Sequence, residues 1–136
     1  LKEKNNRMKK LSIVLFLVFI VSGMAFAQQK TSLAFKKNMH DFGKIKEELG
    51  AVTTEFELSN TGNTPVILQR VNTSCGRTTP TYTREPILPG KKGKVIVRYS
   101  TVGRAYPFNK DITVYTNVPD TVYILTIKGN VTPKSN

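Results

Sequence analysis

The side chains that could carry out chemistry in this chain are few, beginning with one cysteine and one histidine. Cys75 and His40 are the only residues of their types among 136 residues. A zinc site takes three or four protein ligands, and a redox relay needs a second thiol to resolve a mixed disulfide. This pair can supply neither set. We therefore expect no metal and no cofactor, and we expect Cys75 to be a structural or incidental thiol.

Hydroxyl and carboxylate side chains give no better catalytic set. A Ser-His-Asp triad can be written from Ser59, His40 and Asp41, but no sequence pattern holds them in the required geometry. Residues 41–43 match the magnesium-binding tripeptide of kinases by letters alone, so we expect a strand with a glycine bulge there and a structural His40 at a strand edge. Two acidic pairs fall in a predicted turn and on an alternating solvent face: Glu47 with Glu48, and Glu55 with Glu57. The sequence predicts that the chain is not an enzyme.

Tyrosine and arginine in predicted connections are the better candidates for function. These residue types dominate binding hot spots, and binding residues concentrate in loops. With the lone thiol, they form the candidate interaction surface: Cys75, Arg77, Tyr82, Arg84, Arg104 and Tyr106. Tyr99 and Phe108 are expected in the core instead.

The charge of the chain is strongly basic but scattered. The formal net charge is +12; the first 27 residues hold five cations and one anion, which leaves 16 cations and 8 anions, or +8, for the remainder. The remaining cations fall in different turns and strands and do not interleave with aromatic side chains, as a nucleic-acid platform requires. We expect a solvated basic surface and no specific nucleic-acid partner.

The first 27 residues read as a cleavable signal peptide. Met8 and two lysines open a positive segment, residues 11–21 are apolar apart from Ser12, and Ala25 and Ala27 supply small residues for cleavage. We expect residues 1–7 to lie upstream of the true start, the mature chain to begin at Gln28, and no membrane segment to remain after cleavage. The protein would then be exported to the periplasm, the cell surface or the medium.

The rest of the chain has the pattern of a small all-β domain. Short alternating segments rich in β-branched residues are separated by turn signals every 8–15 residues. Strands are predicted within residues 33–45, 52–59, 65–71, 94–100, 110–116 and 121–129, with 72–89 irregular. We expect an immunoglobulin-like antiparallel β-sandwich of about seven strands over 35–131, with a lead-in at 28–34 and a polar tail at 132–136.

A set of short motifs resembles a known family. In chain order they are HDFGKI at 40–45, FELSNTG at 56–62, TSCG at 73–76, LPG at 88–90, GR at 103–104, PF at 107–108, ITVYTN at 112–117 and IKG at 127–129. Over residues 35–131 the chain resembles domain-of-unknown-function family 1573, exported bacterial modules similar to abnormal-spindle and major-sperm-protein type domains. The resemblance implies an interaction-type immunoglobulin-like sandwich without established activity. The family pattern usually reads Cys-Gly-Cys where this chain has Cys75-Gly76-Arg77, so a dithiol or metal role is in doubt here.

These observations favour a non-enzymatic interaction or structural module of the cell envelope. It would bind a protein partner through a sheet edge or through loops. One alternative is a thiol-redox or metal-handling factor using Cys75, against which the missing second sulfur counts. Another is a polysaccharide-binding module, for which an exposed tryptophan would be the usual platform, and the chain has none.

Overall fold

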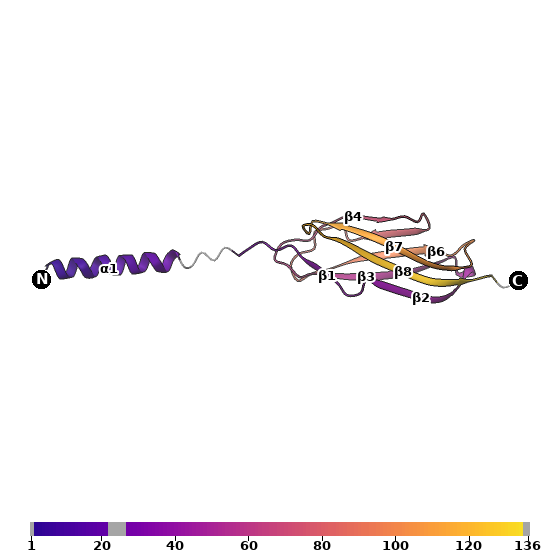
Figure 1. Ribbon diagram of the computed structural model, residues 1–136, viewed down its shortest axis with the longest axis horizontal. Coiled ribbons are helices and arrows are strands. Elements are labelled where there is room, and N and C mark those ends of the chain that lie inside the picture. The colour runs from indigo at the N-terminus through magenta and orange to yellow at the C-terminus, as the bar shows by residue number, and fades with distance from the viewer. Residues whose placement is uncertain (1, 22–26, 135–136) are drawn as a thin grey trace.

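The computed structural model describes residues 2–21 and 27–134 (Figure 1). Its one α-helix, α1 (Lys2–Val21), covers the expected charged and apolar parts of the signal peptide, and side chains 3–18 are exposed. No helix among the described residues is long and apolar enough to cross a membrane. The expected cleavage site at 25–27 falls largely outside the described residues.

Eight strands form two four-stranded sheets that pack as a sandwich (Figure 1). The first sheet has the order β1-β3-β6-β5 and the second the order β2-β8-β7-β4. The strands are β1 (Leu33–Phe35), β2 (Met39–Lys46), β3 (Ala51–Asn60), β4 (Leu68–Thr73), β5 (Thr78–Tyr82), β6 (Lys92–Ser100), β7 (Pro107–Thr116) and β8 (Val122–Thr132), with a short 3-10 helix η1 (Glu47–Leu49) after β2.

The predicted first strand is in fact two strands in different sheets. Residues 33–45 divide at 36–38, where the chain crosses from β1 in one sheet to β2 in the other. β2 then pairs in parallel with β8, so the prediction of an all-antiparallel sandwich is wrong for this pair. Alternation of apolar residues indicates that a segment is extended, but the choice of sheet and of neighbour depends on contacts far apart in sequence.

The segment predicted as irregular contains a strand as well. β5 lies within residues 72–89 and pairs only with β6, which makes it an edge strand. Pro80 occupies its middle, where a missing N–H is tolerated because one side of an edge strand has no neighbour. Proline is depleted in strands, so the sequence pattern did not indicate this one.

The core lies between the sheets, and most of its predicted members are there. Phe56 and Leu58 are fully buried, as the alternation in β3 predicts, and Tyr99 and Phe108 are buried as well. Within the strand predicted at 121–129, alternation places Val122 and Ile124 on one face, and the structure shows that this face is the outer one: both are exposed, while buried positions fall at 125 and 127. Each large apolar side chain that is fully buried stabilises the fold by about 1.5–3 kcal/mol.

The core is self-contained within the sandwich. All of its buried apolar residues fall between Leu33 and Val131, and none comes from α1 among the described side chains. A chain that begins at Gln28 therefore keeps every residue of this core.

Candidate functional site

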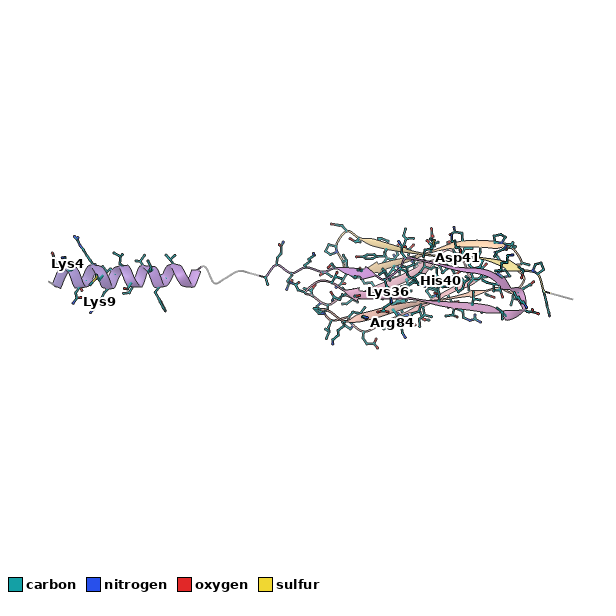
Figure 2. The ribbon with its side chains drawn as sticks, turned by 90° about the horizontal axis from the view of Figure 1, so that it is seen from below. Lys4, Lys9, Lys36, His40, Asp41 and Arg84 are labelled. Carbon is teal, nitrogen blue, oxygen red and sulfur yellow. The ribbon has the colours of Figure 1, made fainter. Side chains whose placement is uncertain are left out.

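The structure divides the predicted interaction surface into two groups. Cys75 and Arg77 precede β5, whereas Arg84 follows it, and a strand of this length separates them by about 16 Å. Arg84 stacks on Tyr82, with the guanidinium carbon 4.0 Å from the ring centroid, and the Tyr82 hydroxyl donates to the Gln69 carbonyl at 3.5 Å. Figure 2 shows where Arg84 lies on the sandwich. The two residues form a pair apart from the others.

The other four residues lie at the end of the sandwich where β2, β4, β6 and β8 finish. We call this the loop end; it comprises residues 47–50, 74–77 and 101–106. The Arg77 guanidinium donates through Nη1 to the Val102 carbonyl, and the Arg77 carbonyl accepts from the Ser100 N–H at 3.0 Å. Arg77 thus connects two loops that lie 25 residues apart in sequence.

Glu47 fixes the 47–50 loop to the 101–106 loop. Its carbonyl accepts from the Thr101 hydroxyl at 2.9 Å, and its Oε1 accepts from the Gly103 N–H at 3.0 Å. Its Oε2 accepts from the Lys134 N–H at 3.3 Å. We expected this carboxylate to be solvated in a turn; it instead holds a loop 56 residues away, a contact for which no local sequence signal exists.

The ordered loops carry large apolar side chains in exposed positions. Leu49, Val102 and Tyr106 are 63%, 57% and 47% exposed. The Arg104 guanidinium lies 5.9 Å from the centroid of the Tyr106 ring. Sequence reasoning found the two arginines and the tyrosine but missed Leu49 and Val102, whose only signal was an apolar residue within a turn.

Cys75 lies half-exposed at the start of a tight turn in the same region. Its N–H donates to the Thr73 hydroxyl at 3.2 Å, and its carbonyl accepts from the Thr78 N–H at 3.1 Å. Burial raises the pKa of the thiol. The Arg77 backbone N–H, the Thr78 hydroxyl and the charges of two cations, Lys110 and Arg104, lower it, so the net pKa lies below its ordinary value.

Two buried hydroxyls lie in this region, those of Thr78 and Tyr99. The Thr78 hydroxyl has only the Cys75 thiol to bond to, and among the described residues the Tyr99 hydroxyl has no hydrogen-bond partner. Thr78 and Tyr99 face each other across β5 and β6, and both side chains are almost fully buried. The Tyr99 ring stacks on Phe108 with centroids 3.8 Å apart. Burial raises the Tyr99 pKa, and the negative charge of a Cys75 thiolate raises it further, which places the phenol within electrostatic range of the thiol.

The remaining chemical candidates are dispersed. His40 lies on β2 and Ser59 on β3, in different sheets, so no triad forms with Asp41. His40 and Asp41 come from the same edge strand in Figure 2. The His40 Nδ1 lies 2.8 Å from Lys37 Nζ, and burial, followed by the Lys37 charge, lowers the His40 pKa. No cluster of three potential metal ligands occurs within 2–21 and 27–134.

The predicted bulge after His40 is present. The pairing of β2 with β8 shifts register between Asp41 and Lys44. Gly43 has a φ of 66°, which glycine adopts readily, and its N–H donates to Asp41 Oδ1 at 2.8 Å. Phe42 packs against the edge of the core.

Comparison with known proteins identifies the family. The model of a family described as "Protein of unknown function (DUF1573)" matches residues 33–131. The chain belongs to this family. The match confirms the resemblance drawn from the sequence motifs. No curated protein matches the chain.

Solved structures similar to this DUF1573 domain support the fold. A protein of unknown function from Porphyromonas gingivalis W83 superposes with a TM-score of 0.67 at 20% identity, covering 79% of this chain and 50% of that one. The VesB protease of Vibrio cholerae gives 0.57 at 13% identity, covering 74% of this chain and 31% of that one. The DUF1573 chain thus spans about half or less of these proteins.

The DUF1573 domain departs from the family pattern at Arg77, where the resemblance implied a second cysteine. The Arg77 side chain instead bridges to Val102. In this chain the position therefore serves to hold the loop end together, and Cys75 has no thiol neighbour within the chain.

Proposed function

We propose that this protein is an exported, non-enzymatic interaction module of the cell envelope, with an immunoglobulin-like sandwich that docks a protein partner through the loop end. The observation that carries the proposal is the set of exposed apolar side chains on hydrogen-bonded loops, Leu49, Val102 and Tyr106. Loops fixed before binding lose little conformational entropy on docking, which favours affinity.

The chemistry of the loop end indicates the kind of partner. Arginine and tyrosine are enriched in binding hot spots, and Arg77 and Arg104 flank the exposed apolar side chains. The chain after residue 27 carries a net charge of +8. The partner would present an apolar pocket rimmed by carboxylates, and the opposite charges would steer the encounter.

Export is supported by the order of features in the first 27 residues. Cations precede an apolar stretch, and small residues follow it, which is the pattern of a secretory signal. Sequencing the N-terminus of protein recovered from the native envelope should give a chain that starts within two residues of Gln28. Recovery of a chain that retains residues 11–21 would contradict cleavage at this site.

The docking proposal can be tested with photocrosslinking side chains in the native envelope. A probe at Val102 should capture one discrete protein, whereas the same probe at Leu88, an exposed residue at the other end of the sandwich, should not. Arg104→Glu should reduce capture from position 102 about tenfold or more, because it places a negative charge against an acidic rim. Lys94→Glu, the control on β6, should leave capture unchanged. Equal capture from both probe positions would exclude the loop end as the docking surface.

A further inference from the structure

A hollow of about 430 Å³ lies on the outer face of β2, β8 and β7, three neighbouring strands of the second sheet. Binding sites for small molecules commonly have volumes of about 300–1,000 Å³, so the hollow has room for a ligand. Part of its floor is backbone without side chains, because Gly43 and Gly129 line it. The hollow is separate from the loop end, since no residue of 47–50, 74–77 or 101–106 lines it.

The pairing register determines which side chains surround the hollow. Six of them, all at least partly exposed, form two rows of three across β2, β8 and β7: Asp41, Lys128 and Asn109, then Lys44, Asn130 and Pro107. The bulge in β2 makes the second row possible, because its extra residue brings Lys44 opposite Asn130. Neighbouring strands lie about 4.8 Å apart and alternate residues of one strand about 7 Å apart, so the two rows enclose an area of about 10 by 7 Å. That area fits one or two sugar rings.

Most polar groups at the hollow have unused hydrogen-bonding capacity. The side-chain amides of Asn109 and Asn130 make no hydrogen bond with any other described residue. Lys128 Nζ lies 3.9 Å from Asp41 Oδ2, which is too far for a hydrogen bond. The other Asp41 oxygen, Oδ1, accepts from the Gly43 N–H at 2.8 Å, which fixes the carboxylate on β2 (Figure 2). The hollow therefore offers a fixed carboxylate, an ammonium group and two amides to a ligand.

The mixture of these groups indicates the chemistry of the ligand. A carboxylate only accepts hydrogen bonds, an ammonium only donates them, and an amide does both. A hydroxyl also does both, so a ligand dense in hydroxyls can pair with every group, whereas a charged ligand would meet a like charge at Asp41 or Lys128. Pro107 adds an apolar surface on which the C–H face of a sugar ring can pack. A protein partner would instead need large apolar or aromatic anchors, and the rim of the hollow has none apart from this proline ring.

We propose that the hollow binds a neutral saccharide. A sugar ring lies across β8 between the two rows, with its hydroxyls hydrogen-bonded to Asp41, Asn109 and Asn130 and its C–H face against Pro107. Hydrogen bonds and the proline ring thus take the place of the tryptophan platform that the chain lacks. The inference is independent of the docking proposal, because the hollow and the loop end share no residue, and either can fail without the other.

The test uses the purified chain that begins at Gln28, titrated with neutral hexasaccharides while its backbone amide signals are followed by NMR. The probes are cellohexaose, maltohexaose, xylohexaose, mannohexaose and N-acetylchitohexaose. At least one probe should give saturable shifts at residues 107–109 and 128–130, with a Kd in the millimolar range or tighter, since an open hollow makes few contacts. No saturable shift with any probe, or shifts confined to other residues, would overturn the proposal.

Two matched variants test the assigned contacts. Asn109→Ala should raise the Kd of the bound hexasaccharide about fivefold or more, because it removes hydrogen bonds to the ligand. Asn72→Ala is the control, at an exposed asparagine of β4 that lies opposite Thr113 and outside the hollow, and it should leave the Kd unchanged. Equal Kd values for the two variants would contradict the site. If a variant does not fold, the location of the shifts on the unsubstituted chain decides alone.

Salt separates hydrogen bonding from attraction by the two lysines. Raising the NaCl concentration from about 50 to about 500 mM should change the Kd less than about twofold, because salt screens charges and leaves hydrogen bonds to a neutral ligand in place. A loss of affinity of about tenfold would show that the surface binds by charge alone and would overturn the proposal.

Discussion

The two ends of the sandwich are both built from loops, yet they use their polar side chains differently. At the end opposite the loop end, which we call the amide end, Asn60, Asn63 and Asn117 organise the connections. The Asn60 amide donates to the carbonyls of Thr64 and Ile87 at 2.7 and 2.8 Å, and its oxygen accepts from the Gly62 N–H at 2.9 Å. Asparagine is well suited to this, because its side chain mimics a peptide group within turns.

The other two asparagines work in the same way. Asn117 accepts from the Ile67 N–H and donates to the Pro65 carbonyl at 2.8 and 2.9 Å. Asn63 accepts from the Lys30 N–H at 2.7 Å and so fixes the segment that leads into β1. The side-chain amides of Asn60, Asn63 and Asn117 thus all have partners inside the chain.

The loop end is held with fewer internal bonds and leaves groups free. Glu47 and Arg77 bridge its loops, but within the described part of the chain the buried Tyr99 hydroxyl has no hydrogen-bond partner. The comparison separates stability from function: the amide end closes the fold, whereas the loop end has unsatisfied and exposed groups of the kind that bind other molecules.

The largest effect is expected at the amide end. Asn60→Ala removes three hydrogen bonds and leaves the buried Ile87 carbonyl without its side-chain donor, so the free energy of unfolding should fall by about 2–4 kcal/mol. Urea titration of the Gln28 chain measures this. Asn109→Ala, at an exposed asparagine of β7, is the control and should stay within about 0.5 kcal/mol. A loss below about 1 kcal/mol for Asn60→Ala would contradict a structural role for this end.

A smaller loss is expected when the bridge of the loop end is removed. Glu47→Ala deletes two exposed hydrogen bonds, so stability should fall by only about 1 kcal/mol. The substitution should have a larger effect on how well the 101–106 loop is ordered, measured as faster hydrogen exchange of the Gly103 amide. Glu48→Ala, at the exposed neighbour, should alter neither. Unchanged exchange at Gly103 would mean that the loop is ordered without Glu47.

Removing the unpaired hydroxyl of Tyr99 should not lower the stability of the fold. Tyr99→Phe deletes a buried hydroxyl without a partner, so the free energy of unfolding should be unchanged or rise by up to about 1 kcal/mol. Thermal unfolding followed by circular dichroism measures the change. Tyr82→Phe, which loses a weak bond to the Gln69 carbonyl, should instead be neutral or slightly destabilising. A clear loss in Tyr99→Phe would show that this hydroxyl has a partner in solution.

The last effect concerns the pH at which a thiol reacts. The comparison is with a thiol placed at the amide end by Leu88→Cys in a chain that also carries Cys75→Ser. Because the pKa of Cys75 lies below its ordinary value, the alkylation rate of Cys75 should reach half its maximum at a lower pH than that of the comparison thiol. With the folded pKa below the unfolded one, the Cys75 thiolate stabilises the fold fully above the unfolded pKa, and this stabilisation is lost as the pH falls through the folded pKa. If the alkylation rates of the two thiols depended on pH in the same way, the loop end would not lower the pKa of its thiol relative to the amide end.

Much of the fold could be predicted from the sequence because its signals are local. Alternation in residues 52–59 and 94–100 placed Phe56, Leu58 and Tyr99 in the core, since successive side chains of a strand point to opposite faces. Asn and Gly at 60–63 and Asn and Pro at 117–120 favour turns, and the structure has connections at both places. The motif set predicted the family over nearly the whole sandwich.

The sequence alone therefore determined the β class, the family, the inward residues of most strands and a set of chemically plausible surface residues. Only the tertiary structure decided that β1 and β2 belong to different sheets, that β2 pairs in parallel with β8, and that Tyr82 and Arg84 lie apart from Cys75. It also decided that Glu47 holds Gly103 and that the buried Tyr99 hydroxyl lies within electrostatic range of the thiol. The physical reason is range: strand periodicity and turn formation depend on neighbours in sequence, whereas pairing and hydrogen-bond satisfaction depend on residues that only the folded chain brings together.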